Sequence, residues 1–532
     1  MRLFAPGMSV LHRAGLGGLA CTLKAMEQCY EAGLLKENEL PRKLRNGRFP
    51  WTINAQEVTL DFGEPDKAKG YLKKLFKFAF QVHNGLIYLP GQYEREPPPA
   101  VLADLQTGLL LTFLQHGRVR KLENTETTVN YEPEGEHGAP VAVTYRKCTS
   151  YRHQRGWTHL VNPRGQLEQR EIQVDGPLSP GTVVRHAALG SHSFMTEPPE
   201  RMLPLYFALV GCLALPVNQG VSALLVPEVK DLEEFALERP AMTPMTAKEC
   251  RIANAADGAL QAQVRLRARR ELRGRSLPGI YAMTFSPTSW ASQQKSRVAT
   301  IFVPPGEMAL NRFERALAAL PTRVIQRTVT ERTGRGRQRT VIERREAFRS
   351  LSIVRPLVAE NLALGKPWYA GFVNLMTKIN PANDEPYRDQ LPSECGGLHD
   401  MVNDAQMWDS EGEKSMVMAV HEAIRQSLGR IKDETDGRSP ECSPATLNRW
   451  ERFRERLRLD LAGAKTEEQA RFALVDLFSR AGNNSVLRQH WEAVLSVFRR
   501  DWRLARDLAL LALASYQGRG EQTVEEPLTE SN

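Results

Sequence analysis

The sequence contains few cysteines, and their spacing excludes a fold held together by cross-links. Seven cysteines occur in 532 residues, and no two of them form a C-x-x-C pair. The odd number and the wide spacing argue against a disulfide framework and against a structural zinc site. Such use of cysteine is typical of a reducing compartment. We therefore expect a cytoplasmic protein that needs no metal and no other cofactor.

Long apolar segments are also lacking. The first residues do not have the basic and then apolar layout of a signal peptide. The most apolar run, residues 202–217, contains Pro204 and Pro216 and is too short to cross a bilayer. The composition, 42% hydrophobic and 25% charged, is that of a globular protein. We expect a soluble chain of about two to four domains without a membrane partner.

Motifs for catalysis are missing as well. The sequence has no G-x-x-x-x-G-K-[ST] loop, no G-x-S-x-G elbow and no H-E-x-x-H motif. Two histidine pairs share a spacing of six residues, His153 with His159 and His186 with His192. Acidic residues do not cluster beside them, which favours polar histidines in strands and turns over a metal site. We predict no catalytic residue and no enzymatic activity.

What the sequence has in excess is arginine. It holds 53 arginines and 18 lysines, and its net charge is +9. Residues 1–395 carry a net charge of +13, and residues 396–532 carry −4. A guanidinium group matches the geometry of phosphate and of the guanine edge, so this excess points to nucleic acid. A genome rich in G and C would also raise the arginine content, so the clustering of the arginines carries the argument.

Two arginine clusters stand out. The segment 265–275 has six arginines and one glutamate, so anion binding is slightly favoured over simple solvation of a helix. The segment 327–346 has the pattern of two strands joined at 333–336, with too few apolar residues to pack as a core hairpin. An arginine-rich ribbon fits a DNA groove, whereas a surface loop that binds nothing is the alternative. The predicted nucleic-acid-binding residues of these clusters are Arg265, Arg269, Arg270, Arg273, Arg332, Arg335, Arg337 and Arg339.

A polar loop at 286–297 is a candidate reader of DNA bases. Glutamine can bond adenine, lysine and arginine can bond guanine, and tryptophan can stack or wedge between bases. An ordinary loop anchored by its tryptophan is about equally well supported. The candidates are Trp290, Gln293, Gln294, Lys295 and Arg297. Lys73 and Lys77, on a lysine-rich helix at 66–82, are further predicted phosphate contacts, although such faces usually serve solvation.

The order of elements predicts an α+β fold in which an irregular mixed α/β body precedes a helical bundle. Residues 124–190 mix β-branched residues with glycine and proline, which indicates strands and loops. Residues 277–303 indicate two strands around a polar loop. Helices and strands do not alternate as βαβ units, which argues against one doubly wound sheet. We place the body at 1–395, with the basic hairpin at 327–346 inside it.

A C-terminal α-helical bundle is predicted at 396–517. Three prolines and a Gly-Gly pair precede it, and apolar residues then recur at spacings of three and four. One helix begins at Thr466, where a capping-box spacing starts, and ends at Gly482. Residues 518–532 form an acidic tail that is predicted to be disordered. The expected helices are 416–431, 446–461, 466–482, 485–499 and 501–516.

Eight stretches, in order along nearly the whole chain, carry a family resemblance. They are MSVLHRAGLGGLACTLKA (8–25), FKFAFQVHNGLIYLPG (76–91), LLTFLQHGRVRKL (110–122), LYFALVGCLALPV (205–217), LLVPEVKDLEEFA (224–236), WASQQKSR (290–297), KPWYAGFVNLM (366–376) and RQHWEAVLSVFRRDWRLARDLALLALASY (488–516). Together they resemble the large subunit of type I CRISPR Cascade effector complexes, in the Myxococcus-like branch of subtype I-B. Each stretch is weak alone, and the ordered set is fairly specific.

The resemblance implies functions that the amino-acid composition does not indicate. Such a subunit lies near the 5′ end of the crRNA, senses the protospacer-adjacent motif (PAM) in duplex DNA, helps to open the duplex and receives a helicase–nuclease. The bundle resembles the small subunit that lines the R-loop, which in this subtype can arise from an internal start, here at a methionine between 401 and 418. His12 and Arg13, in the first stretch, join the predicted nucleic-acid contacts. The implied partners are crRNA, double-stranded target DNA, the backbone, 5′-end-cap and small subunits of Cascade, and a helicase–nuclease or transposition factor recruited in trans.

Two alternatives of other classes stay open at this point. One is a nuclease or nucleic-acid-modifying enzyme with an unrecognised site, and the other is a structural RNA-binding protein. The bundle offers arginine stripes that could guide one displaced DNA strand while the rest of its surface packs on protein neighbours. These arginines are Arg449, Arg452, Arg456, Arg499, Arg500 and Arg503.

Overall fold

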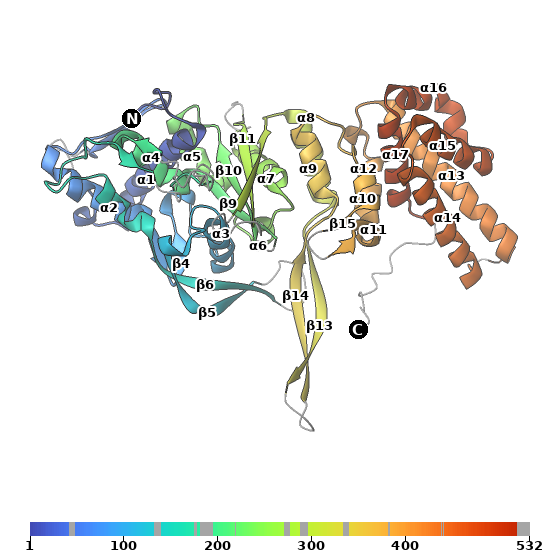
Figure 1. Ribbon diagram of the computed structural model, residues 1–532, viewed down its shortest axis with the longest axis horizontal. Helices are drawn as coiled ribbons and strands as arrows, with labels where there is room; N and C mark the ends of the chain where they lie inside the picture. Colours follow the sequence, from blue (N-terminus) through green and yellow to red (C-terminus); the bar gives the residue numbers. More distant parts are fainter. Residues whose placement is uncertain are drawn as a thin grey trace, which may run out of the picture. The chain divides into compact units, whose positions relative to one another are not determined.

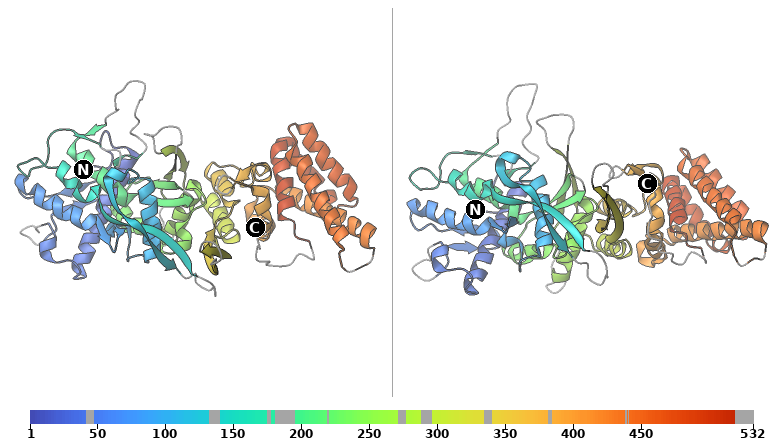
Figure 2. Two further views of the ribbon diagram at one scale, coloured as in Figure 1. Left: turned by 60° about the horizontal axis from the view of Figure 1, so that its bottom comes forward. Right: turned by 90° about the horizontal axis from the view of Figure 1, so that it is seen from below.

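The chain forms two compact units, residues 1–306 with 322–351, and residues 307–321 with 352–532 (Figure 1, Figure 2). Only the backbone is described for residues 327–333 and 340–346 and for Asn218, Arg270, Pro287, Ser296 and Arg297. The computed structural model describes residues 1–41, 48–131, 140–174, 178–180, 195–218, 220–270, 277–287, 296–333, 340–380, 384–437, 439 and 441–518.

The first unit mixes helices with strands, as predicted. Its helices are α1 (Val10–Glu31), α2 (Ala68–Ala79), α3 (Pro99–Leu111), α4 (Pro199–Gly211), α5 (Leu232–Met242), α6 (Ala247–Cys250) and α7 (Ala255–Arg270). Its strands are β1 (Trp51–Ile53), β2 (Val58–Leu60), β3 (Gln81–His83), β4 (Leu86–Tyr88), β5 (Arg120–Tyr131), β6 (Val141–Tyr151), β7 (Ile172–Gln173), β8 (Thr196–Glu197), β9 (Leu213–Asn218), β10 (Val221–Pro227), β11 (Ile280–Pro287), β12 (Ser296–Val303), β13 (Arg323–Thr333) and β14 (Thr340–Ser350).

The core of the first unit is built on close contact between α1 and α4. A side chain at Gly15 would place its Cβ 2.0 Å from the Pro204 carbonyl oxygen, and one at Gly18 would lie 2.2 Å from the Phe207 carbonyl oxygen. Glycine at these positions lets the two backbones touch, so larger residues would push the helices apart. The apolar run at 202–217 thus becomes buried α4 and β9. Among the described helices, none is long and apolar enough to cross a membrane.

Two four-stranded sheets organise the rest of this unit. One has the order β12-β11-β10-β9 and is antiparallel throughout, with α7 packed along it. The other has the order β13-β14-β6-β5, and its two hairpins meet at a single parallel pair, Ala347 with Val141. Figure 1 shows β13 and β14 extending well beyond the helices of this unit. The predicted strands around the loop at 286–297 are confirmed as β11 and β12.

The prediction of strands and loops across 124–190 is right only in part. Residues 152–159 form a 3₁₀-helix that packs on α2, and a strand between 167 and 175 is limited to Ile172–Gln173. Gly156 lets the 3₁₀-helix pack closely on the Tyr206 ring, because a Cβ at this position would lie only 2.3 Å from the ring. At 152–159 an aromatic contact between distant segments thus replaces the expected strand. Residues 181–194 lie outside the described residues.

The second unit is helical, and the expected helices are confirmed within a few residues. The Thr466 side chain accepts a hydrogen bond from the Gln469 amide, and Gly482 ends α15 with φ of +81°. The long α13 packs against α14, α15, α16 and α17. The elements of the second unit are α8 (Glu307–Ala319), α9 (Arg355–Ala363), α10 (Val373–Thr377), β15 (Ile379–Asn380), β16 (Glu385–Pro386), α11 (Tyr387–Gln390), α12 (Cys395–Asn403), α13 (Glu411–Asp436), α14 (Pro444–Ala462), α15 (Glu467–Ala481), α16 (Ser485–Arg500) and α17 (Trp502–Ser515).

This compact unit starts earlier in the sequence than the predicted boundary at 396. The Glu394 carboxylate accepts hydrogen bonds from the Ile353 amide at 2.7 Å and the Ser352 hydroxyl at 2.8 Å. Asp507 in α17 is buried and accepts a hydrogen bond from the Gly371 amide at 2.6 Å. Helix signals in the sequence are local, whereas these polar contacts join distant segments. Residues 307–321 and 352–395 therefore belong with the C-terminal helices.

We predict that a fragment of residues 352–518 is more stable than one of residues 398–518. The shorter fragment loses the hydrogen bonds that the Gly371 and Val373 amides donate to the Asp507 carboxylate, and a hydrogen bond to a charged group contributes about 1.5–3 kcal/mol. Thermal unfolding followed by circular dichroism should give a cooperative transition for the longer fragment and a lower midpoint for the shorter one. Equal midpoints would show that the segment before residue 398 adds nothing to the bundle.

Candidate nucleic-acid interface

The β13–β14 hairpin is a long basic ribbon. Its register runs from Arg323 opposite Ser350 to Thr333 opposite Thr340, which at about 3.4 Å per residue is a length of roughly 34 Å. Within the described part of the chain, the ribbon pairs with another strand only at Ala347. The predicted hairpin is thus present. Arg332 lies in β13 near its end, and Arg335, Arg337 and Arg339 fall outside the described residues.

A buried ion pair fixes the base of this ribbon to α3. Both nitrogens of the Arg349 guanidinium fork donate to the Asp104 carboxylate, the longer bond being 3.2 Å, and Arg349 also donates to the Ala247 carbonyl oxygen at 2.6 Å. Their side chains are 6% and 1% exposed. Arg251 lies 3.5 Å from the same carboxylate. Removing one partner of such a buried pair typically costs about 3–5 kcal/mol, so the pair holds β14 firmly.

The same helix holds the neighbouring hairpin. The buried Gln106 amide donates to the Arg146 carbonyl oxygen in β6 at 2.8 Å and accepts from the Ile87 amide at 2.9 Å. Asp104 and Gln106 therefore tie β14 and β6 to one helix. Neither residue was predicted from the sequence, although a carboxylate and an amide inside the apolar segment LADLQTGLLL were a signal that could have identified them.

The loop at 286–297 connects β11 and β12. The pairing of β11 with β12 ends next to this loop with Ser286 opposite Arg297 and Pro287 opposite Ser296. Trp290, Gln293, Gln294 and Lys295 lie outside the described residues, and only the backbone of Arg297 is described. The loop and the β13–β14 ribbon belong to different sheets of the first unit. Joint action of the two on one DNA duplex stays a prediction.

The arginines of α7 differ from the expected solvent-facing cluster. Arg265 is half-buried, its Nε donates to the Met242 carbonyl oxygen at 3.0 Å, and burial lowers the pKa of its guanidinium. Arg269 donates to the Leu237 carbonyl oxygen at 3.2 Å and pairs with Glu94. Both arginines thus join α7 to α5 and its surroundings, which argues against their role as free phosphate ligands. The Arg270 side chain and Arg273 lie outside the described part.

Three lysines of α2 form an exposed stripe, here called the α2 lysine stripe. Lys69, Lys73 and Lys77 are spaced four residues apart, which places them on one face of the helix. Within the described residues none of the three forms an ion pair, whereas Lys74 is used internally and donates to the Leu40 carbonyl oxygen. The stripe therefore offers charge without competing acids. Lys73 and Lys77 remain predicted phosphate contacts.

The structure corrects the expectation for His12 and qualifies that for Arg13. His12 is 2% exposed, its Nδ1 lies 2.7 Å from the Ser9 hydroxyl, and its Nε2 lies 3.4 Å from the Glu197 carboxylate. Burial lowers the pKa of its imidazole, so a neutral ring caps α1 and cannot reach a phosphate. Arg13 is half-buried, with its guanidinium 5.5 Å from the Phe4 ring centre. Arg13 can meet a ligand only at its exposed edge.

The histidine pairs do not form a metal site in the described residues. His153 is buried among Phe80, Tyr151 and Tyr206, and its two ring nitrogens have no hydrogen-bond partner among the described residues. His159 is exposed, and His186 and His192 lie outside the described part. No group of three or more metal-ligating side chains comes together in that part. The expectation of a hydrogen-bonded polar histidine is therefore wrong for His153, which serves as packing.

The arginines of the second unit divide into two kinds. Arg500 pairs at 2.5 Å with Glu413, a carboxylate that is 1% exposed, and Arg449 pairs with Glu434 at 2.8 Å. These two are engaged in the bundle itself. Arg452, Arg499 and Arg503 are exposed. The expected stripes are thus partly structural.

Comparison with known proteins shows the class of protein to which this chain belongs. Residues 1–206 match the model of the DevT N-terminal domain, and residues 403–532 match that of the DevT C-terminal domain. The chain therefore has the two-part layout of a CRISPR large subunit of the Myxococcus type. It is 35% identical to the CRISPR-associated protein Cas8a1/Csx13 of Myxococcus xanthus (strain DK1622) over 546 aligned residues, which cover 99% of this chain and 90% of that relative. The chain belongs to the Cas8a1/Csx13 family, and the resemblance seen in the sequence is confirmed.

We predict that His153 makes the first unit sensitive to acid. Burial lowers the pKa of its imidazole to about 3, whereas an unfolded histidine titrates near 6.5. Below about pH 6.5 the unfolded chain binds the extra proton, so stability falls by up to about 1.4 kcal/mol per pH unit until the pH approaches 3.

The test compares melting temperatures of the His153→Phe variant and the original chain between pH 7 and pH 4. The melting temperature of the variant should rise relative to that of the original protein as the pH falls. His159→Phe, which changes an exposed ring, is the control and should follow the original chain. Parallel curves for His153→Phe and the original chain would contradict the assignment.

Proposed function

We propose that this chain recognises the PAM in double-stranded DNA as the large subunit of a type I Cascade complex, without cutting DNA itself. The observation that carries this proposal is the β13–β14 ribbon, which is rich in arginine and, among the residues that the structure describes, pairs with the rest of the sheet only near its base. A ribbon about 34 Å long can follow a groove over about one turn of duplex. In the assembled complex the crRNA would read the target sequence, and the protein would read the PAM and the DNA backbone.

Within this proposal the ribbon and the β11–β12 loop divide the work. Arg332, Arg335, Arg337 and Arg339 would hold phosphates or enter a groove, and the α2 lysine stripe would add backbone contacts. The loop would supply the base contacts through Gln293, Gln294 or Lys295, with Trp290 as a wedge and Arg297 beside it. Phosphate contacts set position and base contacts set specificity.

The second unit would support the R-loop and the partners of the complex. Its C-terminal part would guide the displaced strand, and other Cas subunits and a recruited helicase–nuclease would pack against the remaining surface. A nuclease activity of this chain is the competing function. Incubating the isolated chain with labelled DNA and RNA and with Mg²⁺, Mn²⁺ or Zn²⁺ decides between them, since metal-dependent cleavage would assign the enzyme function instead.

A PAM-library depletion assay should separate the two proposed roles. Changing Arg335, Arg337 and Arg339 together to alanine removes phosphate contacts and should weaken interference with all PAM sequences alike. Changing Gln293 or Gln294 to alanine removes base contacts and should change the preferred PAM, by about 1–3 kcal/mol of discrimination for each lost contact.

Lysine at the three ribbon positions is the matched control. Lysine keeps the charge, so it should restore most of the binding if the arginines hold phosphates, and little of it if they use their planar fork in a groove. If the loop variants keep the original preference and strength, base reading lies elsewhere. If they lose assembly with crRNA, the loop belongs to the RNA.

A second prediction concerns Asp104, which should act on DNA through the ribbon. Asp104→Asn loosens the base of β14, so it should weaken binding of the PAM duplex when the tip arginines are present. When Arg335, Arg337 and Arg339 are already alanine, the same change should have little further effect. Affinities of the four assembled complexes, measured by fluorescence anisotropy, give this coupling directly.

Glu197→Gln is the control for general destabilisation. Glu197 is another buried carboxylate of the first unit, paired with Arg201 and far along the chain from the ribbon. Its effect should add to that of the tip variant. Additive effects for Asp104→Asn as well would mean that Asp104 only stabilises the fold.

A further inference from the structure

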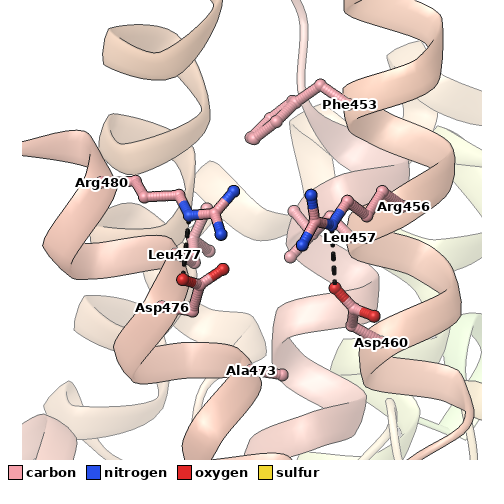
Figure 3. A pocket seen from close by; sticks show the side chains of 8 residues that line it. All are labelled: Phe453, Arg456, Leu457, Asp460, Ala473, Asp476, Leu477 and Arg480. Atoms are coloured by element: carbon pink, nitrogen blue, oxygen red, sulfur yellow. Dashed lines mark hydrogen bonds and ion pairs between the residues drawn. The ribbon is translucent and has the colours of Figure 1, made fainter.

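A groove between α14 and α15 has the chemistry of a binding site for single-stranded nucleic acid. It is lined by four residues of each helix (Figure 3). The lining residues are Phe453, Arg456, Leu457, Asp460, Ala473, Asp476, Leu477 and Arg480. We refer to them as the α14–α15 groove.

Two guanidinium groups face each other across this groove. Arg456 and Arg480 come from opposite walls, and Figure 3 shows their terminal nitrogens directed toward the same opening. Each is held by a carboxylate one turn away on its own helix, Arg456 Nε at 3.7 Å from Asp460 and Arg480 Nε at 2.8 Å from Asp476. The carboxylates thus engage the Nε side, and among the described residues no hydrogen bond occupies the terminal nitrogens of either fork.

This arrangement favours an anion between the two arginines. The carboxylates of Asp460 and Asp476 balance the two guanidinium charges overall, and an anion placed between the two forks accepts charge-assisted hydrogen bonds from both of them. A phosphate group suits the fork of a guanidinium better than it suits a single ammonium. Because the carboxylates orient the arginines, little side-chain entropy is lost when the phosphate binds.

The floor and the end of the groove suit a nucleobase. Leu457, Ala473 and Leu477 are buried and form an apolar floor, and the half-buried ring of Phe453 stands beside the arginines (Figure 3). A base can stack on such a ring, whatever its sequence, for about 1–3 kcal/mol. In a duplex the bases are already stacked on each other, so only an unpaired strand can use the ring.

We propose that the α14–α15 groove binds one nucleotide of a single DNA strand, with its phosphate between Arg456 and Arg480 and its base on Phe453. The inference rests on the proposed function, which brings a displaced strand to the second unit. It adds the site on that unit, the chemical groups recognised and independence from base sequence.

The direct test measures binding of labelled oligothymidylate to the full-length chain by fluorescence anisotropy. The double change Arg456→Gln and Arg480→Gln should weaken binding at least about tenfold, since a hydrogen bond to a charged group contributes about 1.5–3 kcal/mol. Phe453→Leu keeps an apolar side chain but loses stacking, and should weaken binding at least about fivefold. Arg471→Gln is the matched control, because Arg471 is an exposed arginine of α15 that does not line the groove.

Three outcomes would overturn the inference. They are an equal loss of affinity for Arg471→Gln, unchanged binding for the groove variants, and displacement of the oligonucleotide by millimolar inorganic phosphate. The last result would mean a site for free phosphate rather than for a strand. Melting temperatures of the variants should match that of the original chain, because the changed arginines are exposed.

A second measurement separates this inference from the proposed function. In the assembled complex, permanganate modifies unpaired thymines of the displaced strand. The groove variants should still bind and open the PAM duplex, and their displaced thymines should react more strongly than those of the original complex. If the original complex opens no duplex, the proposed function fails. If it does, and the variants react as the original does, only the groove assignment fails.

Discussion

The buried ion pair between Asp104 and Arg349 is the constraint on which the proposed DNA contact depends. A ribbon that pairs with its sheet at one position would pivot about that position without a second point of attachment. The bidentate pair supplies this attachment at the base of β14, and its burial makes it strong. Gln106, two residues further along the same helix, holds β6. The described strands of the ribbon therefore start from a fixed base.

Arginine serves several purposes in this chain, and the structure separates them. Arg265 and Arg269 join helices by bonds to carbonyl oxygens, and Arg500 neutralises the buried Glu413. The side chains of Arg456 and Arg480, by contrast, are 65% and 51% exposed. An excess of arginine thus indicates nucleic acid only where the guanidinium groups are not already used by the fold.

The elements whose signals are local could be predicted from the sequence. The capping residue Thr466, the terminal Gly482 and the apolar periodicity define the bundle helices, and the basic segment around Gly334 defines the hairpin. The fold class and the family follow from such stretches. What escaped prediction depends on long-range contacts, such as Asp104 with Arg349, Asp507 with Gly371, and the burial of His12. Spacing along the chain carries no information about these partners, so the candidate site was only partly predicted.

The central claim is that the tip of the β13–β14 ribbon meets the PAM duplex, and site-specific cross-linking tests it most directly. A photoactivatable amino acid at position 338, between the tip arginines, would be introduced into the assembled complex with crRNA and a labelled target duplex. The account predicts cross-links to the duplex at and next to the PAM, and only when a PAM is present. Cross-links to crRNA or to protein subunits alone would contradict it.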